Sequence, residues 1–334
     1  MRLADYVVNR CIERGFTDVF MLTGGAAMHL NDAFGRSSRL KLHHLHHEQS
    51  CSIAAESFAR ITNRPAIVQT TAGPGAINAM NGVFGSYVDS IPMLVITGNA
   101  KRETLTEFHQ LSKLRQLGDQ EANIKKIVEP MTKYSVLINN PNLIKYELDK
   151  CISLCISGRP GPCWIDIPID IQAMDIDPSS LIEYNYIENN LDRNEINNNL
   201  SALYSKLLKS KRPLIYAGSG IRISQTLDKL IELSSKNNIP IVTAWNSNDL
   251  IWNDYPLYAG RPGSVGDRAG NLAVQNCDFL LVLGCRLNIR LITYKWTAFS
   301  SMSWKCHVDI DEEELNKPTL NFDMKINCDL KDFF

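Results

Sequence analysis

Residues 65–100 read PAIVQTTAGPGAINAMNGVFGSYVDSIPMLVITGNA and contain a complete strand–helix–strand unit. The apolar runs PAIVQT and PMLVIT have the length and the β-branched content of buried strands, and Ala76–Ser90 between them predicts a helix rich in small residues. Strands that are joined through a helix pair in parallel. The loop Gly73-Pro74-Gly75 follows the first strand, so we expect it at the carboxyl edge of a sheet, where such sheets bind ligands.

The same alternation of helices and strands continues on both sides of this unit. Further elements are expected at residues 3–14, 18–25, 47–62, 143–158 and 162–171. A second glycine turn, Gly24-Gly25, ends one of these strands. A stretch rich in Asp, Asn, Glu and Ser then precedes another α/β block. We therefore predict two doubly wound, mainly parallel α/β domains, a first over 1–172 and a Rossmann-like second over 196–334, with a polar linker over 173–195.

Composition excludes several classes of protein. Of the 334 residues, 35 Lys and Arg balance 36 Asp and Glu, so the chain lacks the surplus of cations that binding of nucleic acid requires. Every apolar run is shorter than the roughly 20 residues of a membrane span, and the N-terminal segment has the charges of an amphipathic helix rather than a signal peptide. Nine scattered cysteines without a CxxC pair indicate free thiols in a reducing compartment. We expect a cytoplasmic protein.

The segment HHLHHEQSCSIAAESFAR, residues 43–60, contains the most informative polar residues. Glu48 stands at the start of a helix whose next turns are small and apolar. An interaction with the helix dipole would by itself explain a glutamate there. The four histidines alternate between the two faces of a strand end, and no set of Cys or carboxylates at ligand spacing completes a site. We therefore predict no metal site in this segment.

Three motifs in the first domain resemble the pyrimidine-binding domain of thiamine-diphosphate enzymes, in family order and with family spacing. They are HHEQSCSIAAESFARIT, TTAGPGAINAMNGVFGSYVDSIPMLVITG and SGRPGPCWIDIPIDIQ. The second block, with GRPGSVGDRAGNLAVQNCDFLLVLGCRLNIR and HVDIDEEELNKPT, resembles the central domain of the same enzymes. The most similar subgroup is the acetolactate synthase-like one, and the resemblance covers nearly the whole chain.

The resemblance gives Glu48 the central chemical role. In these enzymes a glutamate hydrogen-bonds the aminopyrimidine ring and promotes loss of the thiazolium proton, and shelter from water favours this sharing of a proton. Gly24 and Gly25 match the turn that lines the reaction pocket beside the thiazolium. The resemblance places four further residues in the loop near the pyrimidine: Gly73, Pro74, Gly75 and Asn78.

Gln120, in the segment GDQEANI, matches a glutamine in the reaction pocket of the acetolactate synthases. Those enzymes have a phenylalanine directly before it, whereas this chain has Asp119. A charged group at that position does not suit the usual pair of pyruvate and a second ketoacid. We therefore expect a more polar acceptor.

In the second domain the resemblance implies a groove for FAD, with backbone amides on the diphosphate and a carboxylate near the adenosine. The matching residues are Gly218, Gly220, Arg261, Gly263, Gly266, Gly284, Arg286, Asp309 and Asp311. Some relatives leave this groove empty or bind an adenine nucleotide in it. A packed Rossmann-like core with turns would also explain these glycines, so a non-catalytic nucleotide-binding module is the alternative function.

Members of the family have a third domain that holds the cofactor diphosphate through magnesium, marked by Gly-Asp-Gly and paired asparagines. Neither Gly118-Asp119-Gln120 nor Gly266-Asp267-Arg268 fits that pattern. We expect an N-terminal portion of a 2-ketoacid-decarboxylating transferase or lyase, from a truncation, a gene fragment or a split enzyme with a second chain. The resemblance implies at least a homodimer and, as substrates, a 2-ketoacid and an acceptor carbonyl. By itself the chain should be inactive and should bind thiamine diphosphate weakly or not at all.

Overall fold

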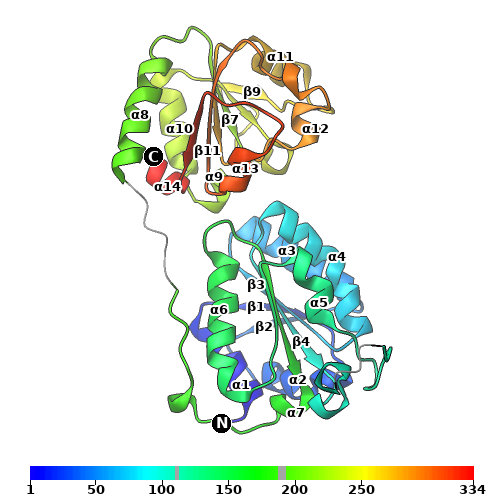
Figure 1. Ribbon diagram of the computed structural model, residues 1–334. Helices are drawn as coiled ribbons and strands as arrows, with labels where there is room; N and C mark the ends of the chain where they lie inside the picture. The colour runs from blue at the N-terminus through cyan, green and yellow to red at the C-terminus, as the bar shows by residue number, and fades with distance from the viewer. Residues whose placement is uncertain (110–112, 187–192) are drawn as a thin grey trace. The chain divides into compact units, whose positions relative to one another are not determined.

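The structure is a computed structural model that describes residues 1–109, 113–186 and 193–334. The chain divides into two compact units, Met1–Glu188 and Asn189–Phe334, here called the first and the second unit (Figure 1). Each unit contains a six-stranded sheet in which all the paired strands are parallel, with helices on both faces. The prediction of two parallel α/β domains is confirmed.

The first unit has the strand order β2-β1-β3-β4-β6-β5. Its strands are β1 (Asp18–Met21), β2 (Lys41–His44), β3 (Ala66–Thr70), β4 (Met93–Asn99), β5 (Tyr134–Leu137) and β6 (Pro162–Pro168). Its helices are α1 (Leu3–Glu13), α2 (Met28–Gly35), α3 (Glu48–Thr62), α4 (Pro74–Asp89), α5 (Ile124–Val128), α6 (Ile144–Ile156) and α7 (Ile169–Gln172).

The alternation of side chains along the central strands divides the helices of the first unit into two layers. On β3, Ile67 packs into the core beneath α1, α2 and α6, whereas Ala66 and Val68 face the core beneath α3, α4 and α5. Helices α3 and α4 cross so closely that a side chain at Gly82 would collide with the backbone of Ser52. The small residues of both helices therefore let the first turns of α3 pack closely against the middle of α4.

The second unit has the strand order β12-β11-β10-β7-β8-β9. Its strands are β7 (Pro213–Ala217), β8 (Ile241–Thr243), β9 (Tyr258–Gly260), β10 (Phe279–Leu283), β11 (Trp304–Asp309) and β12 (Met324–Asn327). Its helices are α8 (Arg193–Leu207), α9 (Gly220–Ile223), α10 (Leu227–Asn237), α11 (Arg268–Asn276), α12 (Ile289–Ile292), α13 (Glu312–Asn316) and α14 (Leu330–Phe333).

Several element ends differ from the sequence-based expectation. The strand expected over 162–171 ends at Pro168, because the chain turns there into the short helix α7. The predicted linker, 173–195, includes residues 187–192, which lie outside the described part of the chain. Within its described part, Ile176 and Leu181 are buried in the core of the first unit.

The described residues form no helix that combines the length and the apolar character needed to cross a membrane. All nine cysteines have free thiols, and all are buried. Burial raises the pKa of these thiols; for example, it raises the pKa of Cys11 to about 12. The cysteines therefore contribute to packing and are not activated nucleophiles.

Candidate active site

The strand order creates a switch point at the carboxyl edge of the first sheet. Strand β1 has β2 on one side and β3 on the other, so the chain leaves β1 and β3 in opposite directions. Sheets of this kind bind their ligands at such a switch point. Gly24 and Gly25 follow β1, Gly73 follows β3, and helix α3 begins after β2 with Glu48. The structure therefore brings these predicted residues to one edge.

Glu48 is the first residue of α3 and is half-buried. Asn78, in the first turns of α4, donates a hydrogen bond of 3.1 Å from Nδ2 to Oε2 of Glu48. The other carboxyl oxygen, Oε1, lies 3.1 Å from the point where a side chain at Gly75 would begin. Pro74 occupies the first turn of α4, where its missing N–H costs nothing. The glycine thus leaves open the space beside the carboxyl group.

Thr71 connects the two glycine turns but was not among the predicted residues. Its Cγ2 lies 2.9 Å from the point where a side chain at Gly75 would begin, and a side chain at Gly24 would collide with Thr71. Thr71 lies within the motif TTAGPGAINAM, but this contact joins two separate loops, so the motif does not reveal it. Gly24, Thr71, Gly75 and Glu48 therefore form a continuous surface.

Gln120 lies against the same surface through its main chain. Gly73 has φ of +50°, and a side chain there would collide with the carbonyl oxygen of Gln120, so only glycine suits this position. The side chains of Gln120 and Asp119 are exposed in this chain. At Gly25, by contrast, a side chain would meet no atom within 4 Å.

The second sheet has a switch point of its own, between β7 and β10. Gly218 and Gly220 follow β7, and Gly284 follows β10. The amide of Gly220 donates a hydrogen bond of 2.9 Å to the carbonyl oxygen of Gly284, and a side chain at Gly218 would collide with that same oxygen. The predicted glycines therefore meet, backbone to backbone, at the carboxyl edge.

The second unit also contains a pocket of about 340 Å³, lined by segments that follow β8 and β9. Its lining residues are Trp245, Asn248, Arg261, Val265, Gly266 and Asp267. Asp267 accepts a hydrogen bond of 2.9 Å from the amide of Arg261 and caps helix α11, and the amide of Gly263 donates to Asn271. Two of the predicted groove residues, Arg261 and Gly266, thus line the pocket.

The remaining predicted groove residues have structural partners in the second unit. Arg286 forms an ion pair of 2.8 Å with Glu314. Asp311 caps helix α13 by accepting a hydrogen bond from an amide of its first turn, and Asp309, at the end of β11, accepts one of 3.0 Å from the amide of Asp311. These bonds fix both carboxylates at the carboxyl edge of the sheet.

Two family models match the chain. The "Thiamine pyrophosphate enzyme, N-terminal TPP binding domain" matches residues 1–123, and the "Thiamine pyrophosphate enzyme, central domain" matches residues 200–334. A protein of Oryza sativa subsp. japonica, "Probable acetolactate synthase 2, chloroplastic", is 34% identical over 321 residues, which are 94% of this chain and 46% of that protein. The chain belongs to the acetolactate synthase-like thiamine pyrophosphate enzymes.

Other members of this family show the same pattern of similarity. The "Acetolactate synthase isozyme 2 large subunit" of Escherichia coli is 30% identical over 322 residues, covering 95% of this chain and 55% of that protein. The "Acetolactate synthase large subunit" of Lactococcus lactis is 32% identical over 324 residues, covering 96% and 54%. The chain spans about half the length of the curated relatives it matches.

Membership of this family makes thiamine diphosphate the expected cofactor, and the residues at the first carboxyl edge fit its aminopyrimidine ring. Gly75 leaves room beside a carboxyl group that can bind the ring. Within the described residues, Oε1 of Gln69 and Oγ1 of Thr70 are buried at the end of β3 without a hydrogen-bond partner. Buried polar atoms of this kind are rare in native proteins, and they are consistent with a polar group bound nearby.

In the described part of the chain, the histidines do not gather around a metal position. His43 forms a hydrogen bond of 2.8 Å with Asp18, and its ring stacks on Phe20. Among the described residues, no group of three or more His, Cys, Asp or Glu side chains is placed to hold a metal ion.

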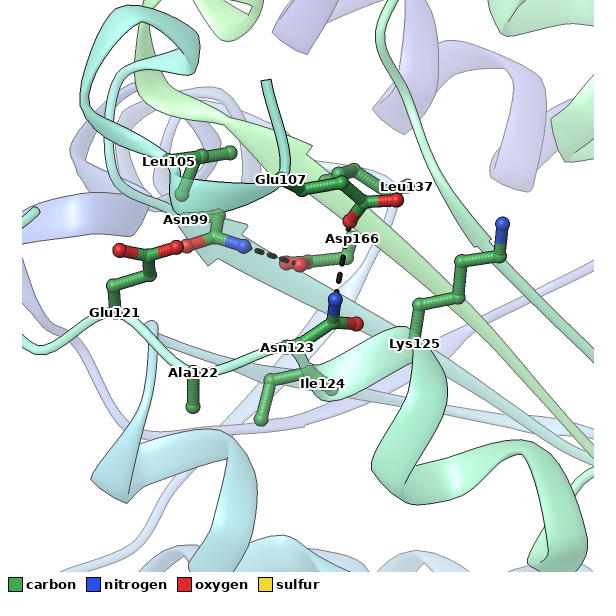
Figure 2. A pocket seen from close by; sticks show the side chains of 10 residues that line it. All are labelled: Asn99, Leu105, Glu107, Glu121, Ala122, Asn123, Ile124, Lys125, Leu137 and Asp166. Atoms are coloured by element: carbon green, nitrogen blue, oxygen red, sulfur yellow. Dashed lines mark hydrogen bonds between the residues drawn. The ribbon is translucent and has the colours of Figure 1, made fainter. Parts of the chain in front are cut away.

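A small polar cavity lies at the ends of β4 and β6, beneath the loop that leads to α5 (Figure 2). Its volume is about 10 Å³, which is room for about one water molecule. Asp166 of β6 is buried beside it and accepts hydrogen bonds from Thr97 (2.8 Å) and Asn99 (2.6 Å). Burial raises the pKa of Asp166 to about 7, although these hydrogen bonds oppose the rise. Asp166 lies within the motif SGRPGPCWIDIPIDIQ, but no role was predicted for its side chain.

Proposed function

We propose that the chain is the N-terminal portion of an enzyme that decarboxylates a 2-ketoacid and transfers the acyl unit to an acceptor carbonyl. The observation that supports this function is the arrangement of Glu48, Asn78 and Gly75 at the switch point of the first sheet. When bound, thiamine diphosphate supplies the nucleophilic carbon and the electron sink. The protein supplies the groups that bind and orient it.

Glu48 holds and exchanges a proton with the aminopyrimidine in this proposal. The amide of Asn78 donates to Oε2 of Glu48 and so fixes the rotation of the carboxyl group, and Oε1 is directed toward the space at Gly75. The missing side chain at Gly75 allows a flat ring to approach the backbone beside Glu48. The main chain of Gln120 and the turn at Gly25 form the walls of the reaction pocket.

The test is the substitution Glu48→Gln in the complete enzyme. The amide keeps the shape of the side chain but cannot take up a proton, so we expect turnover to fall by about 10²–10⁴-fold, with an unchanged circular dichroism spectrum. Glu56→Gln is the matched control, because it removes the same charge from the same helix. Retention by the Glu48→Gln enzyme of more than about 5% of the normal turnover would refute the assignment.

For the second unit we propose a nucleotide groove. The support is the backbone contact between Gly218 and Gly284 at the switch point, together with the pocket at Arg261. FAD is the first candidate ligand and an adenine nucleotide the second. A flavin would give the purified protein absorption in visible light, whereas an adenine nucleotide would be released on denaturation without visible colour. The alternative function is a non-catalytic nucleotide-binding module. In that case the nucleotide binds in this groove, and Glu48→Gln leaves the function of the protein unchanged.

We further propose that the complete enzyme is at least a dimer, with magnesium on the cofactor diphosphate. The helices that bear Glu48 and Asn78 expose large apolar side chains, among them Ile53, Ile77 and Phe84. Exposed apolar side chains on adjacent helices are typical of a protein–protein interface. A second subunit, or a separate chain with the diphosphate-binding half, would cover them.

A further inference from the structure

Glu121 joins the two sides of the loop between β4 and α5 through four hydrogen bonds. Its Oε1 accepts from both the amide and the hydroxyl of Thr106, each at 2.6 Å. Its Oε2 accepts from the amides of Leu117 (3.0 Å) and Gly118 (3.2 Å). Figure 2 shows Glu121 at the small cavity, across from Asn123 and Asp166. One carboxylate therefore connects segments that lie 11 residues apart in the sequence.

The main chain of Glu121 also takes part in the turn that contains Gln120. The amide of Glu121 donates to the carbonyl oxygen of Gly118 at 3.2 Å, which closes a turn with Gln120 in the left-handed region at φ of +55°. That turn places the carbonyl oxygen of Gln120 directly over Gly73. Gly73 in turn begins the loop that leads to Gly75.

Only a carboxylate satisfies this set of donors. Three N–H groups and one O–H group point at its two oxygens, and a glutamine would place an NH₂ group against two of them. Burial alone would raise the pKa of Glu121, but the hydrogen bonds from Thr106, Leu117 and Gly118 outweigh it and hold the pKa below its usual value. The group is therefore an anion at neutral pH, as its donors require.

We propose that Glu121 is a positioning residue, whose carboxylate sets the main chain of Gln120 against Gly73 and so shapes one wall of the thiamine site. That this wall belongs to a thiamine site rests on the proposed function. The coupling between Glu121 and Gly73 can be measured without assuming that function. Among the described residues, no hydrogen bond joins the side chain of Glu121 to Glu48 or Asn78.

The experiment measures amide hydrogen exchange in the chain with Glu121→Gln. Loss of two hydrogen bonds should speed exchange at Leu117 and Gly118 by about tenfold or more. If Glu121 positions the wall, exchange of the hydrogen-bonded amides of Gly75 and Ile77 should rise as well. The matched control is Glu103→Gln, which removes a charge from a mostly exposed side chain of the same loop (76% exposed) and should leave all four amides unchanged.

A milder substitution keeps the test decisive if Glu121→Gln fails to fold. Thr106→Val removes one of the four donors. It should speed exchange at the same amides as Glu121→Gln, those of Leu117, Gly118 and Gly75, but by a smaller factor. Faster exchange at Leu117 and Gly118 with no change at Gly75 would overturn the proposal, because Glu121 would then stabilise its own loop and nothing more.

The complete enzyme provides a second measurement. Glu121→Gln should lower kcat/KM for the ketoacid by about tenfold, and Glu103→Gln should not. An unchanged kcat/KM would overturn the proposal. A normal turnover of the Glu48→Gln enzyme would refute the proposed function instead. The coupling between Glu121 and Gly75 seen in hydrogen exchange would not be affected by that result.

Discussion

Replacing Asp166 by asparagine should change how the stability of the first unit depends on pH. Asp166 is 2% exposed, and burial raises its pKa from 3.8 to about 7. Between about pH 4 and pH 7 the unfolded chain gives up this proton and the folded chain keeps it. The free energy of unfolding therefore falls as the pH rises through this window, and it is constant above it.

The expected size follows from the pKa difference. One pKa unit corresponds to about 1.4 kcal/mol, so the full cost of burying Asp166 in its site is about 4 kcal/mol above pH 7. Asparagine carries no charge at any pH. Its oxygen can accept from Asn99 and its amide can donate to the hydroxyl of Thr97, so both neighbours keep a partner. Between pH 5 and pH 8 the stability of the variant relative to the natural protein should rise by about 3 kcal/mol.

The assay is a urea titration at several pH values, with pulsed hydrogen exchange read on peptides of the first unit, because each unit can unfold in its own transition. Asp170→Asn is the control: it removes a carboxyl group four residues away, one that is only half-buried and paired with Arg102 at 2.7 Å. If the stability difference for Asp166→Asn changes with pH no more than the difference for Asp170→Asn, the reasoning from burial is wrong.

Two further substitutions test the packing. Gly73→Ala should destabilise the first unit by about 1–3 kcal/mol, because φ of +50° and the main chain of Gln120 both exclude a side chain. Gly25→Ala is the control, because a side chain at Gly25 would meet open space. An equal loss of stability in urea for the two variants would contradict this explanation. Arg10→Ala should cost about 3 kcal/mol in a urea titration, because it removes two bonds of 2.8 Å from the buried carboxylate of Asp149. Arg14→Ala, which removes a bond of 3.2 Å, should cost clearly less, and the reverse order would refute the explanation.

The sequence predicted the type of fold and the positions of several site residues along it. Short apolar runs that alternate with helices require parallel strands, and glycine turns after those runs fall at the carboxyl edge. Glu48 was expected at a helix start, and it is the first residue of α3. Gly73, Pro74 and Gly75 were expected in a loop, but Pro74 and Gly75 begin α4, because a proline is favoured in the first turn.

The contacts across the candidate site were less accessible to sequence reasoning. Asn78 binds Glu48 from a different helix, and this pairing depends on how closely α3 and α4 cross. Thr71 and Glu121 lie within motifs of the sequence, but neither was predicted to have a role, because each acts by joining segments that are distant in the sequence. The same is true of Asp166, whose pKa depends on burial by strands and a loop from other parts of the chain.

The sequence by itself determined the alternation of elements, the parallel pairing and the family, because these depend on local periodicity and on motifs that are continuous in the chain. Only the tertiary structure decided the order of the strands and, with it, the switch points between β1 and β3 and between β7 and β10. The physical reason is that periodicity records which face of an element is buried but not which element buries it. Strand order, and every contact between loops that follows from it, depends on the packing of the whole unit.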